Sequence, residues 1–151
     1  FGVGIGRVTK NLINETGCFT IGVDISASMR TLGHIYCNSP NFMSCSVEGL
    51  ASLSSKGFRA DFAYSVLTLQ HSADHLENIN LLFETLTQSG GLYVLNTTYR
   101  VLPVKDGWKF GALDLRPILE AKSTNFQYPP LTDGLIMESL KEQIFSGIYW
   151  K

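Results

Sequence analysis

The chain opens with the glycine-rich stretch GVGIGR at residues 2–7, and the stretch GVDIS follows at residues 22–26. Residues 7–16 place apolar side chains at helical spacing and predict a helix directly after the glycines. Residues 19–24 are β-rich and end in the carboxylate of Asp24. A glycine loop, a helix and a strand that ends in an acid predict an α/β fold whose ligand lies at the carboxyl ends of the strands.

Along the rest of the chain, apolar blocks with the spacing of a helix alternate with blocks typical of strands. The further predicted elements are a helix that begins after Ser26 and ends before residue 38, strands at 42–47, 61–67 and 92–96, a helix after Asp74 with a capping box to Glu77, and a short helix at 113–121. Strands separated by helices predict a mostly parallel sheet covered on both faces. Strands at 135–140 and 144–150 are predicted to close it as an antiparallel hairpin. Residues 99–134, with four of the five prolines, are predicted to be an irregular insertion.

The composition limits the class of protein. The chain has 151 residues, of which 44% are hydrophobic, with 12 basic against 13 acidic side chains. This predicts one globular domain, residues 1–151, and argues against a disordered chain or a strongly basic nucleic-acid binder. No apolar run approaches the roughly 20 residues of a membrane helix, and no signal peptide is recognised. Cys18, Cys37 and Cys45 lack CxxC spacing, so we expect reduced thiols and a cytoplasmic protein.

The glycine loop and Asp24 suit a nucleoside-containing cofactor. Glycines let a ligand approach the backbone, and the helix start offers free N–H groups. Asp24 lies 18 residues after Gly6, where a carboxylate can accept hydrogen bonds from both hydroxyls of a ribose. A dinucleotide fingerprint that begins at Gly2 would need a third glycine at Arg7. The spacing therefore fits a dinucleotide poorly, and an NAD(P)-binding Rossmann oxidoreductase is kept as an alternative.

Four segments resemble the class I S-adenosylmethionine-dependent methyltransferases, in particular their small-molecule, methyltransferase type 11-like branch. They are FGVGIGR at the start, GVDISASM at residues 22–29, FRADFAYSVLTLQHSAD at 58–74 and LTQSGGLYVLN at 86–96, in order over residues 1–98. The resemblance implies a three-layer Rossmann-like α/β sandwich, S-adenosyl-L-methionine as cofactor, and methyl transfer to an O, N or C atom of a small-molecule acceptor. We expect no nucleic-acid or membrane partner, and a homodimer is compatible with the prediction.

The resemblance also implies roles for single residues. Gly2, Gly4 and Gly6 would cradle the methionine part of the cofactor, and Asp24 would bind the ribose hydroxyls. The other cofactor-binding residues that it implies are Ile25 on the adenine ring, Met29 in the same pocket, Ser46, Val47 and Glu48 at the adenine edge, and Ser65 near the methionine part or the transferred methyl group. His71 would lie on the substrate side, where it is the candidate catalytic base.

Two features depart from the family. Its strand 1, and commonly a helical cap, would precede the glycine loop, whereas this chain begins at Phe1. We therefore expect an N-terminal truncation, with a preceding segment that ends in a β-rich run followed by Asp or Glu. The family often has Asp after its third strand, where this chain has Ser46, with Glu48 two residues later.

Each candidate also has a structural interpretation. The loop can be a tight connection without ligand, Asp24 the acid of a helix start, Glu48 a solvated residue and His71 a hydrogen-bonded rim residue. His71 and His75 stand four residues apart, as metal ligands do, but no third ligand is found and we predict no metal. Aromatic residues of the insertion can wall an acceptor pocket or form a satellite core; these are Tyr99, Trp108, Phe110, Phe126 and Tyr128. A non-catalytic relative that acts as an interaction module is the third functional hypothesis.

Overall fold

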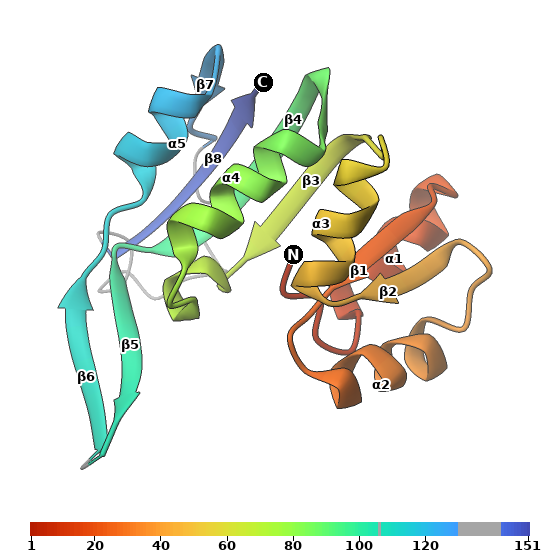
Figure 1. Ribbon diagram of the computed structural model, residues 1–151, viewed down its shortest axis with the longest axis horizontal. Coiled ribbons are helices and arrows are strands. Elements are labelled where there is room, and N and C mark those ends of the chain that lie inside the picture. The colour runs from red at the N-terminus through yellow and green to blue at the C-terminus, as the bar shows by residue number, and fades with distance from the viewer. Residues whose placement is uncertain (106, 130–142) are drawn as a thin grey trace. The chain divides into compact units, whose positions relative to one another are not determined.

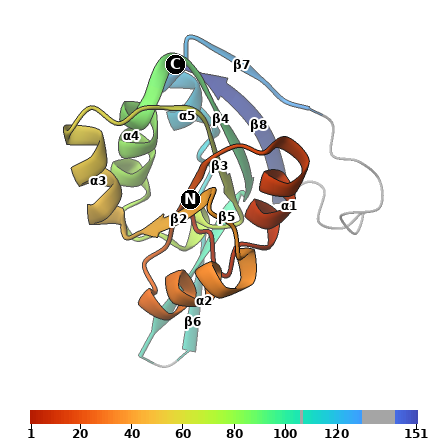
Figure 2. The same cartoon turned by 90° about the vertical axis from the view of Figure 1, so that its right-hand side faces the viewer.

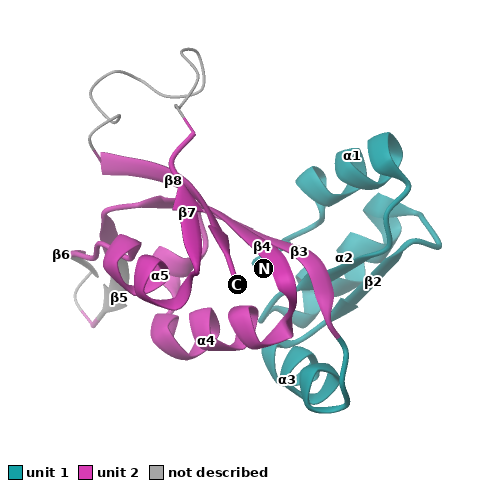
Figure 3. Cartoon of the chain, turned by 90° about the horizontal axis from the view of Figure 1, so that it is seen from above, with its two compact units in different colours: residues 1–58 teal, residues 59–151 magenta. Residues whose placement is uncertain are grey.

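The structure is a computed structural model that describes residues 1–105, 107–129 and 143–151. The chain forms two compact units, which Figure 3 distinguishes by colour. Unit 1 runs from Phe1 to Phe58, and unit 2 runs from Arg59 to Lys151.

Unit 1 is built on a pair of parallel strands with three helices. Its elements are α1 (Arg7–Thr16), β1 (Thr20–Val23), α2 (Ala27–Cys37), β2 (Phe42–Cys45) and α3 (Val47–Ser55). β1 and β2 pair in parallel along their whole length. Figures 1 and 2 show α1 and α3 on opposite faces of this pair. Ile13 of α1, Cys37 of α2 and Phe42 of β2 form the buried core, and Val3 packs against it.

Caps at their ends define the first two helices. The predicted helix at residues 7–16 is confirmed as α1, which ends at Gly17 in the left-handed region. The predicted start of α2 is also confirmed, because the Ser26 hydroxyl oxygen accepts a hydrogen bond from the Met29 N–H at 3.3 Å. α2 ends at the predicted place, with Asn38 as its C-cap.

A third helix lies where the sequence predicted the end of a strand. The strand predicted at residues 42–47 ends at Cys45. The Ser46 hydroxyl oxygen accepts a hydrogen bond from the Gly49 N–H at 3.1 Å and so caps α3. Val47 is therefore the first residue of a helix and not the last residue of the strand.

Unit 2 is built on a four-stranded sheet with the order β3-β4-β8-β7. Its elements are β3 (Ala60–Val66), the 3-10 helix η1 (Leu69–His71), α4 (His75–Thr85), β4 (Leu86–Thr97), β5 (Tyr99–Val104), β6 (Gly107–Ala112), α5 (Arg116–Lys122), β7 (Asn125–Gln127) and β8 (Ile144–Trp150). Figures 1 and 2 show α4 and α5 on the same face of this sheet. The most deeply buried apolar side chains of the unit are Leu69, Ile79, Leu86, Leu92, Val94, Leu115, Leu119 and Tyr149.

The α/β class is confirmed, but the pairing is mixed rather than mostly parallel. β1 pairs with β2 and β3 with β4 in parallel, whereas β8 runs antiparallel to both β4 and β7. The segment that follows β4 is not a single crossover helix, so β8 can return along β4 in the opposite direction. The strand predicted at residues 144–150 is confirmed as β8. Its predicted hairpin partner, residues 135–140, lies outside the described residues.

The first part of the insertion at residues 99–134 is regular, which corrects the prediction. β5 and β6 form a two-stranded antiparallel hairpin. Pro103 lies within β5. A proline cannot donate to a strand ladder, but a two-stranded ribbon tolerates it because alternate N–H groups point away from the partner strand. The short helix predicted at residues 113–121 is confirmed as α5, which begins at Arg116.

The helix after Asp74 is confirmed as α4, but its ends differ from the prediction. The Asp74 side chain makes no capping hydrogen bond, so the predicted capping box with Glu77 is wrong. α4 ends at Thr85, and the glycines that were predicted to break it lie inside β4. A Cβ atom at Gly91 would lie 3.3 Å from the ring of Phe62 on β3. The Phe62 ring therefore packs over the bare backbone at Gly91, where a larger side chain would have to displace it.

The 3-10 helix η1 ties the carboxyl ends of β3 and β4 together. Leu67 follows β3 with φ at 51°, in the left-handed region that leucine rarely adopts, and its N–H donates to the Leu95 carbonyl at 2.7 Å. The backbone N–H of Gln70 in η1 donates to Oδ1 of Asn96 at 3.3 Å. Asn96 is completely buried, so its amide fixes η1 against β4.

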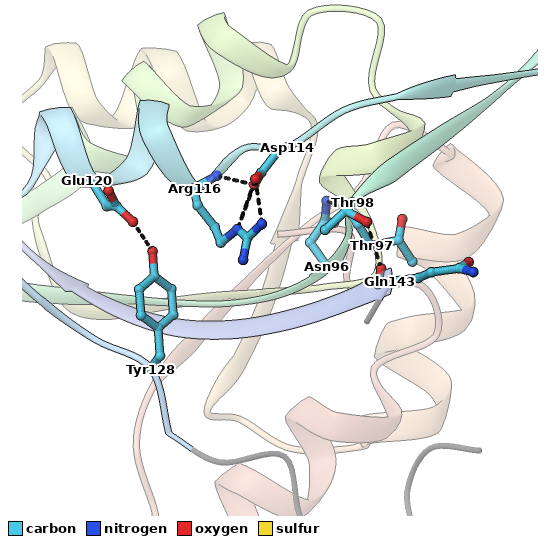
Figure 4. A network of polar contacts seen from close by, with 8 residues as sticks. All are labelled: Asn96, Thr97, Thr98, Asp114, Arg116, Glu120, Tyr128 and Gln143. Atoms are coloured by element: carbon cyan, nitrogen blue, oxygen red, sulfur yellow. Dashed lines mark hydrogen bonds and ion pairs between the residues drawn. The ribbon is translucent and has the colours of Figure 1, made fainter. Parts of the chain in front are cut away.

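Figure 4 shows the polar contacts around α5. The Arg116 guanidinium donates to the Asp114 carboxylate, at 2.8 Å from Nε and 2.6 Å from Nη2, and it lies over the ring of Phe145. The hydrogen bond from Arg116 holds the pKa of the Asp114 carboxyl below its usual value. The Tyr128 hydroxyl donates to the Glu120 carboxylate. These contacts fix the start of α5 and the segment that follows β7.

The helices of the chain are short. α2 and α4, with 11 residues each, are the longest in the described ranges. A membrane-spanning helix needs about 20 residues. None of the helices in the described part of the chain combines the length and the apolar content of a membrane span.

Candidate functional site

The glycine loop, residues 2–6, turns tightly into α1. Gly2, Gly4 and Gly6 have positive φ angles of 72°, 53° and 85°. The N–H groups of Gly2 and of the next residue both donate to the Val23 carbonyl, at 2.8 and 3.0 Å. These two bonds hold the loop at the carboxyl end of β1. Gly6 is the N-cap of α1, so the predicted arrangement of loop and helix is confirmed.

Two of these glycines are needed for different reasons. A Cβ atom at Gly6 would lie 2.5 Å from Sγ of Cys37, so Gly6 gives room to the core of unit 1. A Cβ atom at Gly4 would have no atom of the described residues within 4 Å. Core packing therefore does not explain Gly4. An open surface beside a bare backbone is what a ligand that approaches the loop closely requires.

Asp24 is held against the glycine loop by both of its carboxylate oxygens. Oδ2 accepts a hydrogen bond from the Gly4 N–H at 2.8 Å, and Oδ1 accepts one from the Ser26 N–H at 2.9 Å. The structure therefore brings together the loop and the acid that the sequence placed 20 residues apart. The second bond also gives Asp24 a part in the start of α2. A carboxylate has about four lone-pair positions, so two remain for the hydroxyls of a ligand.

The predicted adenine-binding residues lie in unit 1 as well. Ile25 is 85% exposed directly after Asp24, and Met29 is 39% exposed on the first turn of α2. Ser46, Val47 and Glu48 form the start of α3 rather than the end of a strand. The Ser46 hydroxyl lowers the pKa of the exposed Glu48 carboxyl by a hydrogen bond, and the charge of Arg30 lowers it further. An exposed apolar side chain beside the Asp24 carboxylate suits a flat, weakly polar ring.

Arg30 belongs to this site and was missed in the sequence. Its Nη1 donates to the backbone carbonyl of Asp24 at 2.6 Å and to that of Ile25 at 3.1 Å. No spacing motif identifies such a residue. The available signal was a cation near the N-terminal end of α2, where the helix dipole favours the opposite charge.

Ser65 and His71, the other two candidates, belong to unit 2. Ser65 is buried in β3, and its hydroxyl has no hydrogen-bond partner among the described residues. His71 is the exposed last residue of η1, and its backbone N–H donates to the Thr68 carbonyl. His75 begins α4, so the two histidines do not share a helix face. The role of His71 as a base and that of Ser65 beside the cofactor stay predictions.

The aromatic residues of the insertion form part of a ring cluster. The rings of Phe126 and Tyr128 lie 6.5 and 6.2 Å from the ring of Tyr149, which is completely buried. Phe126 and Tyr128 are themselves exposed. The structure describes Trp108 and Phe110 by their backbone in β6 only. Within those ranges, no three His, Cys, Asp or Glu residues gather closely enough to hold a metal ion.

A glycine loop that meets a strand-end carboxylate on an α/β fold defines a protein that binds a nucleoside-containing cofactor. Residues 1–95 match the methyltransferase domain family. This match spans well over half of the chain, so the chain belongs to that family. The predicted resemblance to class I S-adenosylmethionine-dependent methyltransferases, whose cofactor is S-adenosyl-L-methionine, is confirmed. A comparison with curated protein sequences gave no match.

Solved structures share the fold. An S-adenosylmethionine-dependent methyltransferase from Mesorhizobium loti superposes with a TM-score of 0.68 at 14% identity, over 99% of this chain and 88% of that one. The CurJ carbon methyltransferase has a TM-score of 0.73 at 15% identity, over 99% of this chain and 46% of that one. The [4+2]-cyclase SpnF has a TM-score of 0.68 at 14% identity, over 99% and 72%. At these identities the likeness establishes the fold.

Proposed function

We propose that the protein transfers a methyl group from S-adenosyl-L-methionine to an O, N or C atom of a small-molecule acceptor. The observation that carries the proposal is the contact between Asp24 and the loop. The carboxylate is fixed by the N–H of Gly4 at 2.8 Å, at a loop position where a Cβ atom would meet none of the described atoms within 4 Å. A preorganised carboxylate next to an accessible backbone fits a ligand that carries a ribose and a flexible polar tail.

Each part of the site has a defined task in this proposal. Asp24 accepts hydrogen bonds from the ribose hydroxyls with its two remaining lone-pair positions, and Ile25 packs on the adenine ring. The loop around Gly4 follows the methionine part of the cofactor. When bound, the cofactor supplies a sulfonium-activated methyl group, so the protein mainly contributes position and orientation. His71 takes a proton from acceptors that must lose one.

The wider assignment follows from the same proposal. The family match crosses the boundary between the two units, which supports a single functional domain over residues 1–151. Cys18, Cys37 and Cys45 are free thiols, which supports a reducing, cytoplasmic setting. The β5–β6 hairpin and the exposed rings of Phe126 and Tyr128 are the proposed acceptor side. A homodimer is compatible with this assignment.

Calorimetric titration with S-adenosylhomocysteine tests the proposal. We expect saturable binding, and we expect Asp24→Asn to weaken it about 10–100-fold, because the amide carries no charge and keeps only one acceptor oxygen. Asp61→Asn is the matched control, since Asp61 is exposed on β3, outside the proposed site. Absence of binding, or equal affinity of Asp24→Asn and wild type, would overturn the proposal.

Two further titrations separate the alternatives. NADH binding in preference to S-adenosylhomocysteine would favour the oxidoreductase. Binding of S-adenosylhomocysteine, but no labelled methyl transfer to any member of a broad acceptor pool, would favour a non-catalytic relative or another reaction on the same fold. The [4+2]-cyclase SpnF, which shares the fold, makes that screen necessary.

A further inference from the structure

Arg30 joins the backbone at the end of β1 to the first turns of α2. Its Nη1 donates to the carbonyl oxygens of Asp24 and Ile25, at 2.6 and 3.1 Å. The Asp24 N–H donates to the Cys45 carbonyl at 3.1 Å, which is the last backbone bond between the two strands. Beyond that point the chain leaves the sheet. Neither carbonyl is paired by the sheet at this point, and the guanidinium supplies a protein partner for both.

The geometry of the helix explains how Arg30 reaches these atoms. Side chains of an α-helix point back toward its N-terminus, so a side chain in the second turn of α2 covers the segment that precedes the helix. A cation at this end of a helix opposes the helix dipole. The helix itself therefore gives no reason for an arginine at this position, whereas two charge-assisted hydrogen bonds to carbonyls do.

The two carbonyls belong to the residues that are proposed to recognise a nucleoside. The Asp24 carboxylate is already held by the Gly4 and Ser26 N–H groups. Arg30 bonds the backbone carbonyl of Asp24, so the residue is held at its backbone as well as at its carboxylate. Arg30 also bonds the backbone carbonyl of Ile25, whose side chain is 85% exposed. An exposed side chain has few contacts of its own to keep it in place. Its direction therefore depends on the backbone that Arg30 fixes.

We propose that Arg30 is a positioning residue for nucleoside recognition: it fixes the Asp24–Ile25 backbone so that the carboxylate meets the ribose hydroxyls and Ile25 meets the adenine ring. This inference rests on the proposed function, because it assumes that a ribose and an adenine occupy this site. Arg30 itself need not touch the cofactor. Arg30 instead sets the position of the Asp24 carboxylate and the Ile25 side chain, which touch the cofactor. Its loss should therefore weaken directional interactions, such as the hydrogen bonds to the ribose, more than others.

The test compares Arg30→Met, which keeps most of the side-chain length and removes the donors, with wild type. The ligands are S-adenosylhomocysteine and its 2′-deoxy analogue, which lacks one of the hydroxyls that Asp24 would bind. We expect Arg30→Met to weaken S-adenosylhomocysteine binding about tenfold and to reduce the preference for the ribose over the deoxyribose. Arg30→Lys keeps a charged donor and is expected to recover part of both effects. Arg116→Met is the control, since Arg116 pairs with Asp114 in unit 2.

The ratio of the two affinities separates positioning from general stability. If Arg30 only stabilised unit 1, its loss would weaken both ligands by the same factor and leave the ratio at its wild-type value, which would overturn the inference. Hydrogen exchange of the Ser26 N–H in the ligand-free protein gives a second readout. Arg30→Met should speed this exchange relative to amides in the middle of α2, because Ser26 is bonded to the Asp24 carboxylate. Unchanged exchange would also overturn the inference, whereas failure of wild type to bind S-adenosylhomocysteine would overturn the proposed function itself.

Discussion

Alanine in place of Gly4 or Gly6 separates a ligand cradle from a tight turn. Both glycines have positive φ, so either alanine must adopt the left-handed region. Only the alanine at Gly6 would meet a neighbour, because its Cβ atom would lie 2.5 Å from Sγ of Cys37. The alanine at Gly4 would meet none of the described atoms within 4 Å. The two variants should therefore differ in which property they lose.

The expected magnitudes follow from these contacts. The left-handed conformation costs an alanine about 1–2 kcal/mol at either position. Overpacking against the Cys37 sulfur adds about 1–3 kcal/mol at Gly6. We therefore expect Gly6→Ala to destabilise unit 1 by about 2–5 kcal/mol, and Gly4→Ala by about 1–2 kcal/mol. S-adenosylhomocysteine affinity should fall at least about tenfold in Gly4→Ala, because the new methyl group stands where the cofactor approaches the backbone.

The stability assay must report on unit 1. Trp108 and Trp150 both lie in unit 2, so tryptophan fluorescence does not suffice. Hydrogen exchange of the α1 amides follows the helix that begins at the loop, and calorimetry measures the affinity in the same samples. Cys37→Ala on the Gly6→Ala background removes the sulfur that the new methyl group would meet. In a double-mutant cycle, the double variant should then be more stable than the two single effects predict, by about 0.5–3 kcal/mol.

Two results would refute this reasoning. Equal S-adenosylhomocysteine affinity of Gly4→Ala and wild type would mean that no ligand passes Gly4, and the loop would then be a tight connection only. Equal stability of the Gly4→Ala and Gly6→Ala variants, with no coupling to Cys37, would mean that the sulfur moves aside without cost.

Two other predictions concern the thiols and one ion pair. Cys18 should react with iodoacetamide at neutral pH well before Cys37, because a hydrogen bond from the Thr16 hydroxyl lowers the Cys18 pKa and burial raises that of Cys37; peptide mass spectrometry measures the order. The Asp114 pKa is depressed in the folded state, so its bond to Arg116 adds stability above the unfolded pKa of about 3.9 and loses it as the pH falls through the folded value. Both side chains are partly exposed, so Asp114→Asn should cost at most about 1 kcal/mol at pH 7 and progressively less as the pH falls through the folded-state pKa, measured by urea unfolding.

The sequence predicted the part of the site that depends on local spacing. The helix at residues 7–16, the end of β1 directly before Asp24 and the cap at Ser26 each follow from patterns a few residues long. Because the glycine loop and β1 both end at the same edge of unit 1, the meeting of Gly4 with Asp24 could be expected from the order of the elements alone.

The remaining features depend on contacts that no short pattern contains. Cys37 contacts Gly6 across 31 residues of sequence. Arg30 bonds backbone carbonyls, which every residue has, so the types of the neighbouring residues do not indicate this contact. Pro103 suggested irregular structure because the tolerance of a two-stranded ribbon for proline appears only once the pairing is known. Ser46 was assigned to a strand because a serine that caps a helix and one that ends a strand look alike when a short helix follows.

Leu67 holds a conformation that a glycine would adopt without strain. Its φ of 51° costs a leucine about 1–2 kcal/mol, and its side chain is 44% exposed, so little burial offsets that cost. If a library of variants were selected for heat tolerance alone, we would therefore expect glycine to replace Leu67. If leucine is kept under such selection, its role lies in the function of the turn that leads into η1 and His71, and not in the stability of the fold.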